Sequence, residues 1–185
     1  MNEEEIRKLT APLSREEIIS LRAGQKVLLS GHIYGARDAA HKRLCQAIKS
    51  GKQLPLDLKG QIFYYTGPTP ARPGSDRAVG SAGPTTSYRM DAYTPLLLEH
   101  GLKGTIGKGP RSRDVVEAII KAGAVYFIAI GGLGALISRS IKSADIVAYE
   151  DLGAEAVWEF AIENFFLIVA TDAAGDDIYK KIRRR

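Results

Sequence analysis

Short apolar runs that alternate with amphipathic segments restrict the fold of this chain most. The runs VYFIAIGG at 125–132 and FFLIVATD at 165–172 have the pattern of buried strands, and the helical pattern at 113–123 ends in a glycine. Strands that alternate with helices favour a parallel sheet, whereas the strict alternation of VWEFAI at 157–162 indicates a more antiparallel C-terminal part. The sequence therefore predicts an α/β fold with a mixed sheet and flanking helices.

The N-terminal half repeats the order of strand, glycine turn and helix. Ser14 with Glu17 three positions later is a capping-box pattern, which predicts the start of a helix. The remaining elements follow from periodicity and glycine punctuation. We expect helices over 14–21, 39–48 and 133–141 and strands over 26–33, 61–68 and 145–150.

Size and composition bound the class of protein. The chain has 185 residues, 45% of them hydrophobic and 25% charged, which is typical of one globular domain spanning 1–185. The apolar runs are shorter than the about 20 residues that cross a bilayer, and the N-terminus is acidic, so we expect no membrane segment and a cytoplasmic location. The single cysteine, Cys45, excludes an internal disulfide and cannot hold a zinc or iron-sulfur site alone.

The positive charge has two readings. The formal net charge is +5, and the last six residues, KKIRRR, are basic apart from one isoleucine. No basic stripe with interleaved aromatic residues appears elsewhere, so we expect no nucleic-acid partner. The basic end is then either a solvated terminus or part of a field that attracts a small polyanionic substrate.

The segment 67–93 has little periodicity and is the most informative part of the chain. Loops longer than about 15 residues inside a compact domain are usually functional or disordered. This one contains GSAGPTTSYRMD at 80–91, with the hydroxyl residues Thr85, Thr86 and Ser87 just before Arg89. A threonine is a poor base at its ordinary pKa, so Thr85 needs cationic neighbours and a dry site to move a proton.

Cations also stand at two element ends. Arg37 comes after a strand and a glycine turn at the start of a helix, where it either clamps a carboxylate or phosphate or pairs with Asp38 or another acidic neighbour. His41, one turn later, is either an acid–base group or a structural hydrogen-bonding group. With Arg89 and Lys108, Arg37 completes a set of three cations, enough to hold both carboxylates of a small dicarboxylic acid.

Two glycine-rich motifs are weak matches to nucleotide-binding patterns. GTIGKGPR is not a phosphate-binding nucleotide loop, because Leu102 and Gly109 stand where glycine and Ser or Thr belong. Lys108, held between two glycines, either offers its ammonium to an anion or is an exposed turn lysine. GGLGALIS at 131–138 is half of a dinucleotide fingerprint with Ile137 in place of the third glycine, which favours a tight strand-to-helix turn.

Four motifs in order, GARDAAHKR, YYTGPTP, GSAGPTTSYRMD and GKG, carry a resemblance over nearly the whole chain, from about 12 to 172. The chain resembles the C-terminal domain, or separate β subunit, of class I iron-sulfur fumarate hydratases and their L(+)-tartrate dehydratase relatives. The resemblance implies a swivelling β/β/α domain. It also implies a cluster-bearing α subunit or N-terminal domain, a 4Fe-4S cluster on that partner and none on this chain, and a dimer of αβ pairs.

The resemblance also implies roles for particular residues. Arg37, Arg89 and Lys108 correspond to carboxylate-binding cations, and Thr85 corresponds to the base that takes the C3 proton of malate. The implied reaction is reversible hydration of fumarate to L-malate, catalysed only together with the α subunit, with L(+)-tartrate dehydration as the alternative. The residues alone leave open a different class, a stand-alone module that binds an anionic metabolite.

Overall fold

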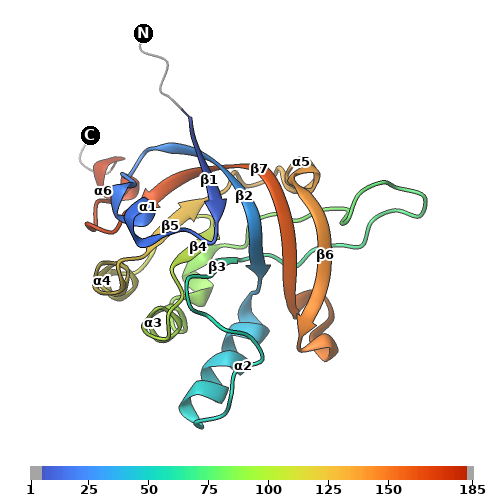
Figure 1. Ribbon diagram of the computed structural model, residues 1–185, viewed down its shortest axis with the longest axis horizontal. Helices are drawn as coiled ribbons and strands as arrows, with labels where there is room; N and C mark the ends of the chain where they lie inside the picture. Colours follow the sequence, from blue (N-terminus) through green and yellow to red (C-terminus); the bar gives the residue numbers. More distant parts are fainter. Residues whose placement is uncertain (1–5, 183–185) are drawn as a thin grey trace.

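Strand pairings form a closed circuit in this protein (Figure 1). The computed structural model describes residues 6–182, so the acidic residues 3–5 and the three final arginines lie outside the description. Within 6–182 one sheet has the order β1-β2-β3-β4-β5-β7-β6, and β7 also pairs with β2. The strands are β1 (Arg7–Ala11), β2 (Lys26–Gly35), β3 (Ile62–Tyr64), β4 (Gly104–Gly107), β5 (Val125–Ile128), β6 (Ile141–Ala148) and β7 (Val157–Thr171).

The sheet is mixed, as the sequence predicts. Strands β1 to β5 pair in parallel, and β7 runs antiparallel to β2, β5 and β6. The α-helices are α1 (Arg15–Ser20), α2 (Asp38–Lys49), α3 (Thr94–Glu99), α4 (Arg113–Ala122), α5 (Gly134–Ile137) and α6 (Ile178–Ile182). The 3₁₀ segments are η1 (Ser87–Met90), η2 (Ser138–Ser140) and η3 (Glu150–Glu155). The predicted α/β class with flanking helices is confirmed.

Strand β7 joins two runs that the sequence suggested as separate strands. Phe160 and Ile162 are buried, and further along the strand the buried positions become Phe165 and Leu167, so the inward-facing parity changes. The change occurs at Asn164, which has a positive φ of 51° and donates its backbone N–H to Ser30 Oγ at 3.0 Å. A bulge of this kind lets one long strand continue while the inward-facing positions change from even-numbered to odd-numbered residues, so both halves contribute to the same core.

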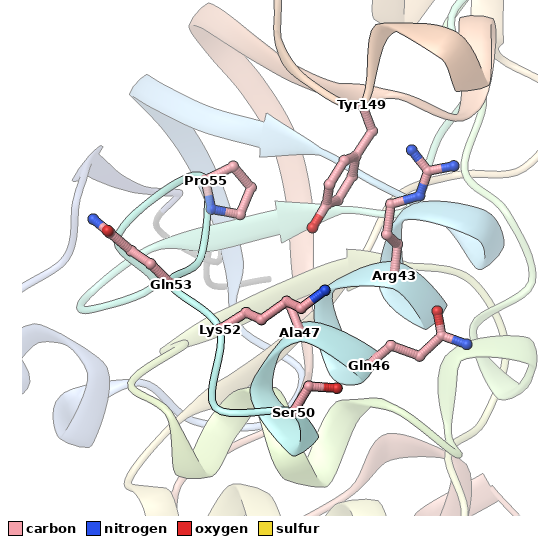
Figure 2. Close-up of a pocket in the computed structure, with 8 residues that line it drawn as sticks. All are labelled: Arg43, Gln46, Ala47, Ser50, Lys52, Gln53, Pro55 and Tyr149. Atoms are coloured by element: carbon pink, nitrogen blue, oxygen red, sulfur yellow. The ribbon is translucent and has the colours of Figure 1, made fainter.

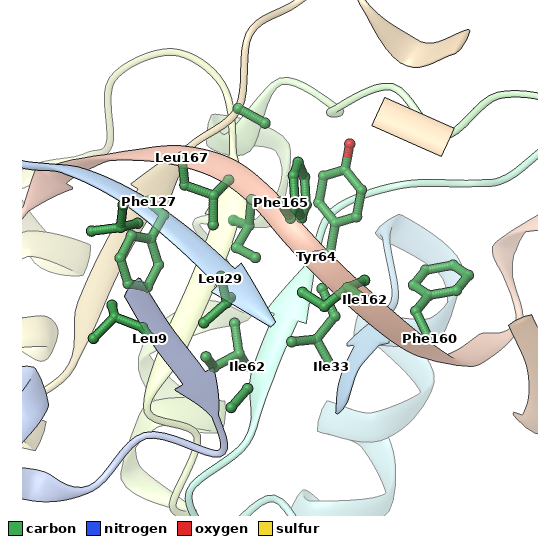
Figure 3. Close-up of a cluster of buried hydrophobic side chains, with 14 of the residues drawn as sticks. Leu9, Leu29, Ile33, Ile62, Tyr64, Phe127, Phe160, Ile162, Phe165 and Leu167 are labelled. Atoms are coloured by element: carbon green, nitrogen blue, oxygen red, sulfur yellow. The ribbon is translucent and has the colours of Figure 1, made fainter. Parts of the chain in front are cut away.

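Two apolar cores lie on opposite sides of the sheet. Figure 3 shows side chains from β1, β2, β3, β5 and β7 converging inside the circuit, among them Leu29, Tyr64 and Phe165. The second core lies between the sheet and α2, α3 and α4, which Figure 1 shows on one side of the molecule. Strands β3 and β4 are buried along their whole length, as parallel strands covered on both faces are. Strand β3 contributes Ile62 and Tyr64 to the first core and Phe63 to the second, whereas β4 contributes Ile106 to the first.

Several local predictions are confirmed and others need correction. The Ser14–Glu17 capping box forms, and α4 ends at Gly123 in the left-handed region. Strand β1 was not expected, and the predicted helix over 133–141 is only α5 followed by η2, because β6 begins at Ile141. In the described residues no helix is long and apolar enough to span a membrane.

The long segment 67–93 is irregular apart from η1, and Figure 1 shows its first part reaching away from the sheet. The later part of the segment is fixed by hydrogen bonds that its backbone carbonyls accept. Tyr64 donates its hydroxyl to Ala82 O, and Thr66 donates to Gly83 O at 2.9 Å. Thr69 and Ser81 form an isolated bridge. The part of the segment that follows Ser81 is therefore held against the end of β3.

Gly31 offers a test of how closely β1 approaches β2. A Cβ on Gly31 would overlap the carbonyl oxygen of Ala11, whereas Gly24, with a similar positive φ of 100°, has open space around it. We expect Gly24→Ala to cost about 1 kcal/mol of unfolding free energy, from backbone strain alone. Gly31→Ala should cost about 3 kcal/mol or more. Urea denaturation of both variants measures the difference, and equal losses would contradict the close approach.

Candidate functional site

The four residues predicted to form a site follow the carboxyl ends of neighbouring parallel strands. Arg37 follows β2, Thr85 and Arg89 lie in the segment after β3, and Lys108 follows β4 directly. Thr85 N donates to Tyr65 O at 2.6 Å, just beyond β3. Thr86 forms a parallel bridge with Lys108. The fold therefore gathers these residues at one edge of the sheet, where ligands bind in many α/β proteins.

Arg37 is held by a carboxylate and by a glycine. It is the N-cap of α2, and its Nη2 lies 3.2 Å from Glu155 Oε1, while Glu155 Oε2 accepts the backbone N–H of Ala39 at 2.9 Å. A Cβ at Gly67 would lie 2.9 Å from the Arg37 Cζ and Nε atoms. Glycine at position 67 therefore gives the guanidinium room to lie against the backbone after β3.

Arg89 is paired with Asp38 in a two-pronged contact. Its Nε lies 2.9 Å from Asp38 Oδ1, and its Nη2 lies 2.8 Å from Asp38 Oδ2. Of the alternatives left open for Arg37, pairing with Asp38 is thus wrong, because Arg89 takes that partner. Arg37 does pair with an acidic neighbour, Glu155. Because each guanidinium has five N–H donors, the carboxylate contacts leave further donors on both arginines.

Lys108 extends along the loop between β5 and α5. A Cβ on Gly131 would lie 3.4 Å from its Cδ and 3.9 Å from its Nζ. Among residues 6–182 the lysine makes no ion pair. Gly134, the first residue of α5, lies so close to the segment after Ser81 that a Cβ there would be 2.9 Å from Gly83 N. The close contacts support the tight-turn reading of GGLGALIS.

Thr85 brings a hydroxyl to the same edge. Its side chain is half-buried, and within the described part of the chain its hydroxyl makes no hydrogen bond. The residue is fixed instead by its backbone, through the contact with Tyr65 O. The Thr85 hydroxyl, which lies in the same segment as Arg89, is therefore available to hydrogen-bond to a ligand.

His41 is a buried structural group. Its Nδ1 lies 2.9 Å from Arg37 O, and the rings of Phe63 and Tyr65 pack edge-on against it. Burial lowers the pKa of His41 from 6.5 to about 4, and the Arg37 carbonyl opposes that shift only in part. The imidazole is therefore neutral near pH 7, which supports the structural reading of the two left open.

Sequence reasoning missed three charged residues that organise this site: Asp91, Arg111 and Glu155. It considered Asp38 only as a partner of Arg37, whereas Asp38 pairs with Arg89. The available signal for Asp91 was its position two residues after Arg89. Arg111 and Glu155 gave no local signal, because their partners lie far away along the chain. Arg111 has a fully buried side chain and pairs with Asp91.

None of the four predicted site residues lines the cavity of Figure 2, and their side chains are half-buried or, for Arg89, exposed. That cavity, of about 660 Å³, lies between α2, the loop after it and Tyr149, and most of its lining residues are exposed. Next to the site instead are exposed apolar side chains. Tyr88, which precedes Arg89, is 66% exposed, and Ile130, Leu133 and Leu136 are exposed in the chain around Gly131, against which Lys108 lies.

Metal-binding capacity is low in the described residues. From residue 6 to residue 182 no group of three or more His, Cys, Asp or Glu side chains is placed to hold a metal ion. Cys45, on the buried face of α2, is part of the second core, and burial raises the pKa of its thiol to about 11. A thiol with that pKa is a poor metal ligand, because metals bind the thiolate.

Comparison with known proteins gives consistent matches. The family model described as fumarase C-terminus matches residues 2–182. The chain is 38% identical to fumarate hydratase 2 of Leishmania major over 169 residues, which is 90% of this chain and 29% of that protein. It is 40% identical to the anaerobic class I fumarate hydratase of Escherichia coli over 159 residues, which is 85% of this chain and again 29% of the relative.

A second kind of relative has nearly the same length. The chain is 36% identical to the putative L(+)-tartrate dehydratase subunit beta of Methanocaldococcus jannaschii over 177 residues, which is 94% of this chain and 91% of that subunit. The chain therefore spans 29% of the length of the two hydratases and nearly all of the subunit.

The buried His41 predicts a pH dependence of stability. The pKa of His41 is lowered from 6.5 to about 4 on folding, so between these pH values the unfolded chain binds a proton that the folded chain does not. The free energy of unfolding is therefore unaffected by His41 above pH 6.5 and decreases as pH falls from 6.5 to about 4. Relative to His41→Gln, wild type should lose about 3 kcal/mol over that range. His100, which is exposed but bonded to the carbonyl four residues earlier in the same way, is the control. Urea titrations at several pH values test this, and parallel profiles for wild type and His41→Gln would contradict it.

Proposed function

The chain belongs to the family of fumarase C-terminal domains, and on that basis we propose that it supplies half of the active site of a hydro-lyase. The proposed reaction is reversible hydration of fumarate to L-malate, with L(+)-tartrate dehydration as the alternative. The observation that supports it best is the gathering of Arg37, Arg89, Lys108 and the Thr85 hydroxyl after neighbouring parallel strands. Three cations suit a substrate with two carboxylates.

The cations have a chemical role beyond binding. Removing the C3 proton of malate places negative charge on the adjacent carboxylate, and preorganised donors stabilise such charge best in a site without water. Arg37 and Arg89 are preorganised by Glu155 and Asp38 and keep free N–H donors. In this proposal Thr85 first loses its hydroxyl proton to solvent, and the alkoxide then takes the C3 proton and becomes the neutral hydroxyl again. The nearby cations lower the pKa of the hydroxyl and so favour the alkoxide.

The described residues do not fit an iron-sulfur cluster, because Cys45 is alone and buried and no other metal-binding group exists between 6 and 182. We therefore assign the 4Fe-4S cluster of this enzyme class to a partner α subunit. The named relatives support a partner, since one is a β subunit of nearly equal length and the hydratases are much longer.

The partner would cover the open edge of the sheet. Tyr88, Ile130, Leu133 and Leu136 are exposed apolar side chains beside the cations, and such patches mark protein contacts. Covering them would also exclude water from the substrate. We propose that this domain swivels against the partner to admit substrate, as a β/β/α domain, and that two αβ pairs form the enzyme in the cytoplasm.

Reconstitution tests the proposed function. We expect the purified chain to show no hydratase activity and to gain it when mixed anaerobically with a cluster-bearing α subunit. Fumarate and L(+)-tartrate assayed side by side decide between the two substrates. Absence of activity on both, with a partner shown to bind, would overturn the proposal. Tight binding of malate, tartrate or a nucleotide by the isolated chain, measured by calorimetry, would favour the anion-binding module instead.

Thr85 carries a separate prediction. Thr85→Ala should lower kcat of the reconstituted enzyme about 100-fold or more, because a general base contributes about that much. Thr85→Ser keeps the hydroxyl and should keep most of the activity. Thr10→Ala, on the exposed face of β1, is the control for a lost threonine hydroxyl. Unchanged turnover in Thr85→Ala, with normal thermal unfolding, would remove Thr85 from the mechanism.

A further inference from the structure

We propose that Arg111, together with Asp91 and Tyr126, is a positioning group that holds the segment 85–91 and thereby places Thr85 and Arg89. The catalytic consequence rests on the proposed function, but the positioning does not. The side chain of Arg111 is fully buried, so it acts through the residues that it contacts and not on a substrate.

Each nitrogen of the Arg111 guanidinium has a hydrogen-bond partner. Its Nε lies 2.7 Å from Asp91 Oδ1, and its Nη2 donates to Thr94 Oγ1 at 2.7 Å. Its Nη1 lies 3.3 Å from Thr105 Oγ1 and 3.3 Å from Tyr65 Oη. The rings of Tyr65 and Tyr126 lie 5.3 and 5.0 Å from Cζ, within the range of cation–π contacts. A buried charge is tolerated only when it is paired in this way, so the surrounding groups are fixed with it.

Asp91 connects this guanidinium to the segment that carries the site. Its second oxygen, Oδ2, accepts the backbone N–H of Ser112 at 2.7 Å, so the carboxylate is clamped between the side chain of one residue and the backbone of the next. Asp91 follows η1 directly and stands two positions after Arg89. The C-terminal end of the segment is therefore anchored to the start of α4.

The start and middle of the segment are anchored by the two tyrosines that flank Arg111. Thr85 N donates to Tyr65 O. The Tyr126 hydroxyl lies 2.9 Å from Ser87 Oγ and 2.7 Å from Gly109 O, and so joins the segment to the backbone beside Lys108. Thr85, Arg89 and Lys108 thus each lie within two residues of a position that these contacts hold, namely Thr85, Ser87, Asp91 or Gly109.

Replacement of Arg111 itself risks unfolding, because it would leave the partly buried Asp91 carboxylate without its partner. Tyr126→Phe is the sharper probe, since it removes only the hydroxyl that reaches Ser87 and Gly109 and keeps the ring beside the guanidinium. Arg113→Gln is the matched control. Arg113 is two residues away, its side chain is 90% exposed, and it pairs with Glu117 on the surface.

Hydrogen exchange on the isolated chain tests the positioning without any activity. We expect Tyr126→Phe to speed exchange of the amides of Ser87, Arg89 and Asp91 at least tenfold, while amides of β2 and β7 keep their rates. Arg113→Gln should change none of them. Unaltered exchange at these three amides in Tyr126→Phe would overturn the proposal.

Turnover by the reconstituted enzyme tests the consequence for Thr85. A displacement of about 1 Å at a reacting group costs about 100-fold in rate, so a small loosening should cost about tenfold. If Tyr126 acts through Thr85, Tyr126→Phe lowers kcat about tenfold when Thr85 is present. When Thr85 is already replaced by alanine, adding Tyr126→Phe should not lower kcat further. Equal losses in both backgrounds would overturn this link. If the wild-type complex is inactive, the proposed function fails, and hydrogen exchange still decides whether the cluster positions the segment.

Discussion

The pairing of β7 with both β2 and β5 is the constraint on which the rest of the structure depends. Residues Trp158 to Ile168 of β7 pair with β2, and Ile168 to Thr171 pair with β5, so the parallel strands close into a circuit. Within the circuit, the parallel pairing of β2, β3, β4 and β5 brings the carboxyl ends of these strands to one edge. Residues separated by long stretches of chain, such as Arg37 and Lys108, reach the same site for that reason.

The acid–arginine pairs at this edge orient cations more than they stabilise the fold. Arg89 and Asp38 are both substantially exposed, and exposed ion pairs contribute at most about 1 kcal/mol. The buried Arg111 differs, because its loss leaves a desolvated carboxylate. Exposed pairs can therefore share their donors with a dicarboxylate, while the buried pair holds the backbone that carries them. Lys108, without an ion pair in the described residues, adds charge that no protein carboxylate neutralises.

Exposed apolar side chains surround the predicted site. In the proposed enzyme, Leu133, Leu136 and Tyr88 would form an apolar rim that a second protein covers. The cavity beside Tyr149 has neither the cations proposed for substrate nor buried polar groups. In the proposed enzyme, the partner would convert this edge into a closed, dry site, where fixed charges act more strongly than in water.

The sequence by itself determined several local elements and singled out the residues proposed for the site. The capping box of Ser14, the glycine stop at Gly123 and the loop with Thr85 and Arg89 are signals within a few residues. Only the tertiary structure decided that β7 is one strand bent at Asn164, that Arg89 takes Asp38 while Arg37 takes Glu155, and that Arg111 anchors the loop. Such partners are distant along the chain, and local periodicity holds no information about which distant residues closure of the sheet brings together.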